Sequence, residues 1–235
     1  MHTNMRTRMT TTENPHSQLR LLHLVSPSLP IGAFTYSQGL EWAVECGWVR
    51  SEAQLLEWIE DLMHTSLAQM EIPCLARLLR ACAENNPQDL AYWTSYLIAS
   101  RETRELREEE HNRGRALARL LPEIGIPVPT QIMPVLKSCQ LTGFAHAAYH
   151  WRIPLRSAAE GYLWGWLENI TLAGVKIVPL GQSAGQRVIA TLTSAIPALV
   201  EKGLTLPDEA IGASCPAQAL ASSQHETQYT RIYRS

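Results

Sequence analysis

The chain has 235 residues, of which 46% are hydrophobic and 18% charged, and its formal net charge is −2. A chain of this length buries roughly 70–75% of its extended surface on folding, so a substantial core is expected. The near-neutral charge argues against nucleic acid or an anionic membrane as the main partner.

Cysteine usage and the absence of a leader indicate the compartment. The five cysteines are scattered and form neither a Cys-x-x-Cys pair nor a zinc-like cluster, which is typical of reduced cytosolic thiols. Near the N-terminus, Arg6 and Arg8 are followed by polar residues where a signal peptide needs an apolar run. Because the sequence also lacks a run of about 18 apolar residues, we expect a cytoplasmic protein.

The first third of the chain predicts a polar arm and then helices. After a flexible arm over residues 1–17, a short helical stripe must end near Pro27. Segment 26–41 is expected to form a turn, in which Thr35 or Ser37 caps a helix that stops at Gly47. We therefore expect a bounded helix on each side of this turn.

Three later signals mark helix starts or breaks. Ser51 and Gln54 have capping-box spacing, and Pro73 should kink or restart the helix that they begin. The run Asn-Pro-Gln-Asp at 86–89 combines a capping residue, a first-turn proline and a first-turn acid. A new helix is therefore expected from about residue 87.

The stretch 101–119 is predicted to be helical but has few apolar residues. Between Glu102 and Arg113 its only large apolar residue is Leu106, so little apolar packing is expected. Two interpretations remain open for its charges: a solvated helix face, or a polar surface that contacts a partner.

Further helices are expected over 130–150 and 154–178, the second rich in small residues and interior, and from a cap at Ser183. Beyond about residue 203, glycine, proline and small residues indicate a linker that leads to a terminal peptide. The sequence thus predicts an all-α, single-domain helical bundle of roughly eight to ten helices over 18–202. Residues 203–235 are expected to be a linker and a partner-binding C-terminal tail.

Candidate enzymatic sites are weak. The glycine-containing run 181–185 lacks the Gly-Lys-Ser/Thr of a phosphate loop and is better interpreted as a turn that starts a helix. The sequence has no Gly-x-Ser-x-Gly elbow, and the contiguous carboxylates of residues 108–110 point in different directions around a helix. We expect a protein without a catalytic site.

For the candidate metal and partner residues, two interpretations remain open in each case. His146 and His150 would share one helix face, either as a structural pair or as part of a weak or shared nickel site. Lys176 interrupts an apolar run, where its ammonium group could reach solvent or an acidic partner. The terminal residues Tyr229 and Arg231 are either interface anchors or part of a frayed terminus.

Segment 26–41, Ser-Pro-Ser-Leu-Pro-Ile-Gly-Ala-Phe-Thr-Tyr-Ser-Gln-Gly-Leu-Glu, resembles the urease accessory protein family UreF. Three further parts of the chain agree with that family and occur in its order. These are 101–106 with 114–117, then 175–182 (Val-Lys-Ile-Val-Pro-Leu-Gly-Gln), and finally the peptide 225–235.

The resemblance implies an all-α, non-enzymatic protein that forms a homodimer and a complex with the accessory protein UreD, called UreH in some organisms. That complex would recruit the GTPase UreG, regulate or couple GTP hydrolysis, and deliver nickel to the urease apoprotein. Nickel and GTP would be handled by the complex, with no cofactor of the chain's own. The alternative function is a metallochaperone that binds nickel directly through His146 and His150.

The resemblance also assigns partner contact to individual residues. The C-terminal tail is expected to face UreD, the turn after Lys176 to face a partner or a second copy, and Glu41 to face the GTPase. A specialised helix connection is the other interpretation of the segment that contains Glu41. The partner-binding residues so assigned are Glu41, Lys176, Gln182, Arg187, Tyr229, Arg231, Tyr233 and Arg234.

Overall fold

The computed structural model describes residues 16–235, and every regular element within that range is helical. The predicted all-α fold is therefore confirmed. Residues 1–15 of the predicted N-terminal arm lie outside the described residues, and Ser17 begins the first helix. The α-helices are α1 (Ser17–Val25), α2 (Leu40–Glu45), α3 (Glu52–Leu62), α4 (Ile72–Ala83), α5 (Pro87–Ala99), α6 (Arg104–Glu123), α7 (Met133–Ser138), α8 (Gln140–His150), α9 (Leu155–Ile177), α10 (Gln182–Thr193), α11 (Ile196–Thr205) and α12 (Pro216–His225).

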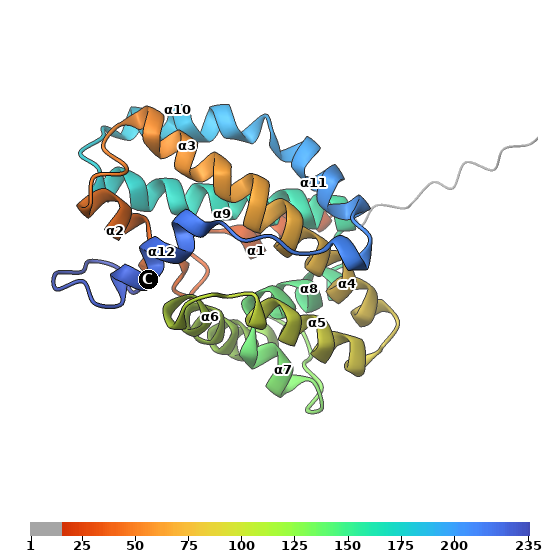
Figure 1. Cartoon of the computed structure of the whole chain (residues 1–235). Helices are drawn as coiled ribbons and strands as arrows, with labels where there is room; N and C mark the ends of the chain where they lie inside the picture. Colours follow the sequence, from red (N-terminus) through yellow and green to blue (C-terminus); the bar gives the residue numbers. More distant parts are fainter. Residues whose placement is uncertain (1–15) are drawn as a thin grey trace, which may run out of the picture.

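The helices form two groups around one continuous core (Figure 1). One group contains α3, α9 and α10, which pack against one another, and the other contains α5, α6, α7 and α8. Helix α4 contacts members of both groups, and α12 packs against α2 and α6. The C-terminal part of the chain therefore joins the two groups at one end of the molecule.

Helix α9 is the interior helix that its small residues predict. A Cβ atom added at Gly174 would lie 2.6 Å from a methyl carbon of Leu55, and one at Gly161 would lie 2.7 Å from a methyl carbon of Leu21. These glycines let α3 and α1 approach the α9 backbone. In the part of the chain that the structure describes, no single helix combines the length and hydropathy of a membrane span.

Helices α3 and α4 are the ends of one continuous helix, joined by the π-helical segment η2 (Met63–Glu71). Ser51 caps its start as predicted, because the Gln54 amide donates to Ser51 Oγ over 3.3 Å, while the Gln54 side chain accepts from the Arg50 amide over 2.9 Å. Pro73 has no N–H for the carbonyl four residues earlier, and that carbonyl, on Gln69, instead accepts from the Gly212 amide over 3.0 Å. Because Pro73 has no N–H to donate, the Gln69 carbonyl is available to bind Gly212, in the segment between α11 and α12.

Of two other predicted helix caps, one is confirmed and one is wrong. Asn86 caps α5 as expected, since its side-chain oxygen accepts from the amides of Gln88 and Asp89 at 3.1 Å each. The cap predicted at Ser183 is wrong: α10 begins one residue earlier, after Gly181, without a side-chain cap.

The region after residue 203 contains more structure than a linker and a tail. Helix α11 continues to Thr205, and α12 occupies 216–225. The extended segment between them is fixed to the body, because Tyr96 donates to the Ile211 carbonyl over 2.7 Å and Arg77 contacts Asp208 at 2.7 Å. Helix α12 was not predicted because small and polar residues dominate it and its apolar pattern is weak.

The contact of α6 with the chain between α7 and α8 generates a first prediction. A Cβ atom at Gly114 would lie 2.8 Å from the Cys139 nitrogen, which is main chain and unable to rotate away. We expect Gly114→Ala to lower the free energy of unfolding by about 1–3 kcal/mol. Urea denaturation measures the change. In the control Gly181→Ala the added methyl group meets open space, and its cost should stay below about 1 kcal/mol.

Candidate functional site

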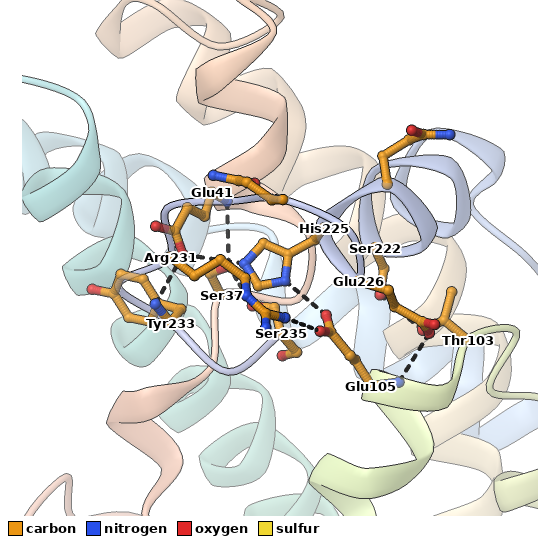
Figure 2. A network of polar contacts seen from close by, with 12 residues as sticks. Ser37, Glu41, Thr103, Glu105, Ser222, His225, Glu226, Arg231, Tyr233 and Ser235 are labelled. Atoms are coloured by element: carbon orange, nitrogen blue, oxygen red, sulfur yellow. Dashed lines mark hydrogen bonds and ion pairs between the residues drawn. The ribbon is translucent and has the colours of Figure 1, made fainter.

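A buried polar cluster joins the C-terminal tail (residues 226–235) to α2 and α6 (Figure 2). Its centre is Glu41, which is 5% exposed. The Ile232 amide donates to Glu41 Oε1 over 2.7 Å, and the Tyr233 amide donates to Oε2 over 2.8 Å. Hydrogen bonds to an ionised carboxylate are stronger than neutral ones, so Glu41 fixes the tail backbone.

His225, the last residue of α12, links this carboxylate to a second one. The ring is fully buried, with Nε2 3.2 Å from Glu41 Oε2 and Nδ1 2.7 Å from Glu105 Oε2. Glu105 Oε1 also accepts from Arg231 over 2.9 Å. One imidazole and two carboxylates therefore tie α2, α6, α12 and the tail together.

The last residues of the tail lie against the turn that precedes α2. The Arg234 amide donates to the Thr35 carbonyl over 2.9 Å, and the Ser37 amide donates to the Ser235 oxygen over 2.8 Å. The Ser37 hydroxyl also donates to that oxygen and accepts from the Glu41 amide over 3.2 Å. Ser37, one of the two predicted caps, thus bonds the start of α2 and the tail at once.

A second set of buried charges continues from this cluster into the interior. Arg101 lies 2.7 Å from Glu71 Oε1 and 2.6 Å from Glu110 Oε1, while Tyr162 donates to Glu71 Oε2 over 2.6 Å. These ionised groups come from η2, α6 and the turn before α6. The interior of α6 is therefore held by ion pairs where apolar packing is scarce.

Glu109, next to Glu110 in α6, is hydrogen-bonded to the tail. It accepts from Arg113 over 2.7 Å and from Gln38 over 3.0 Å, and the Ser235 hydroxyl donates to its other oxygen over 3.3 Å. The Gln38 side-chain oxygen in turn accepts from the Trp166 indole over 3.0 Å. The tail, α6 and α9 thus share one continuous hydrogen-bonded network.

The environments of the adjacent carboxyls Glu109 and Glu110 shift their pKa values in opposite directions. Burial and the charge of Glu110 raise the pKa of Glu109 above its ordinary value, although Arg113 and Gln38 oppose them. At Glu110 burial acts in the same direction, but Arg101 and Arg113 outweigh it and hold its pKa below the ordinary value. Arg101 and Glu110 therefore form a persistent buried ion pair.

Both interpretations of the α6 charges are wrong for its inward face. Glu105, Glu109 and Glu110 are buried and paired inside the protein, and neither solvent nor a partner surface surrounds them. The signal that was available is the scarcity of apolar residues in a long helix, which leaves paired charges as the means of packing it. Arg101 and Arg113 lie close to their partners in the chain, nine residues from Glu110 and four from Glu109. His225 is 120 positions from Glu105 and has no local signature.

The eight predicted partner-binding residues fall into two places. Glu41 and Tyr233 are buried in the polar cluster, while Tyr229, Arg231 and Arg234 are exposed on the tail. Lys176, Gln182 and Arg187 lie exposed around the turn between α9 and α10, outside this cluster, where Arg187 pairs with Glu52 of α3 at 2.6 Å. Glu41 therefore acts on the tail from within and presents no carboxylate to the surface.

In the candidate nickel pair, His146 and His150, one histidine contacts a backbone carbonyl. His146 Nε2 lies 2.9 Å from the Pro127 carbonyl, and burial lowers the pKa of its imidazole, with His150 adding to the effect. Within residues 16–235 no group of three or more His, Cys, Asp or Glu side chains is arranged to hold a metal ion. A resident metal site at this pair would need ligands from elsewhere.

Two of the cavities that adjoin the network exceed the size of one water molecule. One, of about 50 Å³, lies between α1, α6 and α9, is lined by Gln38, Arg113 and Asn169, and accommodates only a few water molecules. The other is an open groove of about 500 Å³ along the tail, lined by Tyr36, Arg104, Glu105, Glu108, Asn112, Arg231, Tyr233 and Arg234. The tail groove is polar and large enough to receive side chains of another protein.

The buried ion pairs generate a second prediction. Replacing Arg101 by Met removes the cation that Glu71 and Glu110 share and leaves two buried carboxylates uncompensated. We expect a loss of about 3–5 kcal/mol in the free energy of unfolding, measured by urea denaturation. The matched change Arg156→Met breaks only exposed pairs, with Glu160 and Glu201, and should leave the free energy of unfolding nearly unchanged. Equal costs for the two variants would contradict the account of the network.

Comparison with known proteins agrees with the resemblance in the sequence. The family model UreF matches residues 49–193, which run from the start of α3 to the end of α10. The urease accessory protein UreF of Pseudomonas entomophila (strain L48) is 50% identical over 217 residues, which cover 92% of this chain and 97% of that protein. UreF of Alcanivorax borkumensis is 46% identical over 231 residues, 94% of this chain and 100% of that protein. This chain therefore belongs to the UreF family of urease accessory proteins, and its role lies in urease maturation.

Proposed function

We propose that this UreF protein forms a complex with UreD (UreH), recruits the GTPase UreG, and regulates or couples GTP hydrolysis during nickel insertion into urease. The observation that carries the proposal is the tail, whose backbone is fixed by Glu41 while the side chains of Tyr229 and Ile232 stay in solvent. The protein acts in the cytoplasm without a catalytic site or cofactor of its own. Nickel and GTP are handled by the complex.

The exposed tail side chains have the character of interface anchors. Tyr229 is fully exposed and Ile232 is 73% exposed, the two most exposed large apolar side chains among the described residues. Aromatic and Arg side chains contribute a large share of the binding energy at protein interfaces. Because Glu41 already orders the tail backbone, a partner that contacts it incurs less loss of conformational entropy.

The groove beside the tail suits a partner with acidic side chains. Arg231 and Arg234 line it together with Arg104 at the start of α6. Glu105 binds only one edge of Arg231, through Nη1, so part of that guanidinium remains available. We assign the tail and this groove to UreD.

A second surface surrounds the turn between α9 and α10. Lys176 is exposed on the last turn of α9, where its charge is favourable to the helix dipole, and Gln182 is exposed at the start of α10. We assign this surface to UreG or to a second copy of the chain in a homodimer. We do not extend the proposal to direct nickel binding, because the described residues near His146 and His150 offer no third ligand.

The third prediction concerns the tail side chains. Because the hydrogen bonds that hold the tail backbone do not involve the exposed Tyr229 and Ile232 side chains, the double variant Tyr229→Ala/Ile232→Ala should fold as stably as the wild type. Its affinity for UreD should fall at least about tenfold, the usual size of an interface anchor effect. Co-purification and titration with UreD, alongside circular dichroism, measure both quantities.

Tyr92 provides the control for this experiment. It is an exposed tyrosine on α5, outside the tail, and Tyr92→Ala should leave UreD affinity unchanged. Wild-type affinity in the tail variant would refute the assignment of the tail to UreD.

The fourth prediction concerns Lys176. Lys176→Ala should lower urease activation in cells while the free energy of unfolding changes by less than about 0.5 kcal/mol, because the side chain is exposed. Lys202→Ala, another exposed lysine on a last helical turn, is the matched control and should activate urease normally. Normal activation by the Lys176 variant would remove this surface from the proposal.

A further inference from the structure

The histidine at the end of α12 has an unusual environment. Both ring nitrogens of His225 face carboxylate oxygens, Glu105 Oε2 at 2.7 Å and Glu41 Oε2 at 3.2 Å. The ring and both carboxylates are buried, so water does not separate them. A neutral imidazole has one N–H donor and one unprotonated nitrogen, and only the doubly protonated ring donates to two carboxylates.

The charges that face this ring are balanced only when it is protonated. Glu41 comes from α2 and Glu105 from α6, while Arg231 of the tail pairs with Glu105. Glu226, next to His225, is directed to the start of α6, where it accepts from the Arg104 amide over 2.9 Å. With a protonated ring, the two carboxylates around His225 are matched by one imidazolium and one guanidinium.

The remaining ionisable group at this position is a phenol. Burial, together with the charge of Glu41, raises the pKa of Tyr233, so that this side chain stays neutral while an imidazole titrates. Loss of a proton from His225 would then leave an excess negative charge inside the protein. It would also turn a ring nitrogen lone pair toward a carboxylate, and an unpaired buried polar group is costly.

We propose that His225 is a positioning residue: its doubly protonated ring holds α12 and the tail against Glu41 and Glu105, so that docking of the tail is coupled to the binding of one proton. Glu41 connects His225 to the tail backbone, because the same carboxylate accepts from the Ile232 and Tyr233 amides. When the ring loses its second proton, Glu41 and the helix that carries His225 separate, and the tail backbone loses its anchor.

The sign of the pH dependence follows from this linkage. The docked tail binds one more proton than the released tail, so docking is favoured at low pH and weakens as pH rises. The inference concerns the isolated chain. Only one consequence rests on the proposed function: a partner that binds the docked tail would bind less well at higher pH.

Nitrogen chemical shifts test the protonation state directly. In protein labelled with ¹⁵N at histidine, at pH 7, we expect both ring nitrogens of His225 to carry protons. Each nitrogen should then show a one-bond coupling to its own hydrogen. His146, which contacts a single carbonyl, is the internal control and should show one protonated and one unprotonated nitrogen. A His225 ring with one unprotonated nitrogen would overturn the proposal.

Amide hydrogen exchange tests the coupling to the tail. After correction for intrinsic exchange, protection of the Ile232 and Tyr233 amides should fall with rising pH and approach about tenfold per pH unit, the limiting slope for one linked proton. Protection in α9, the interior helix, should persist over the same range. Protection of the tail that does not vary with pH would contradict the coupling.

The variant Glu105→Gln sharpens this test. Its amide oxygen can still accept from Arg231, while its NH₂ group can donate to an unprotonated Nδ1, so the neutral ring fits the site. We expect a tail that is somewhat less protected at low pH but whose protection no longer depends on pH. The wild-type slope in Glu105→Gln would refute the role of His225. Because no partner is present, this failure is distinguishable from failure of UreD to bind the tail.

Discussion

The carboxylate of Glu41 is the contact on which the C-terminal part of the structure depends. It comes from a helix of six residues, α2, and accepts two backbone amides of a tail almost 200 positions later in the chain. An extended terminal segment without a core of its own normally frays. Here the ionised acceptor, the His225 ring and the Ser37 contacts to Ser235 replace apolar packing, so the tail takes one conformation against the body.

The same physical constraint shapes the interior of α6. A helix with so few apolar residues can be buried only if its carboxylates are paired, and Arg101 and Arg113 supply the pairing from inside. Glu109 then accepts from the Ser235 hydroxyl and joins this ion-pair set to the tail. The tail is therefore linked by hydrogen bonds to α6 and, through Gln38 and Trp166, to α9.

Local signals in the sequence predicted most of the helices, because caps, prolines and apolar spacing act within a few residues. The cap at Asn86 and the box at Ser51 are examples. The polar cluster could not be predicted in the same way. Glu41 and Glu105 are 64 positions apart and are brought together by His225 and the tail, so neither the pairing nor the burial has a local pattern. The resemblance to UreF identified the tail and Glu41 as important, but the inward direction of Glu41 required the structure.

The most direct test of this account is the affinity of Glu41→Ala for UreD. A partner cannot touch this buried carboxylate, so the residue can influence binding only by fixing the tail. Titration of the full-length variant, with its helical content checked by circular dichroism, should show affinity lowered at least about tenfold, as for an exposed interface anchor. Wild-type affinity in a folded Glu41→Ala protein would contradict the claim that the buried cluster presents the tail to its partner.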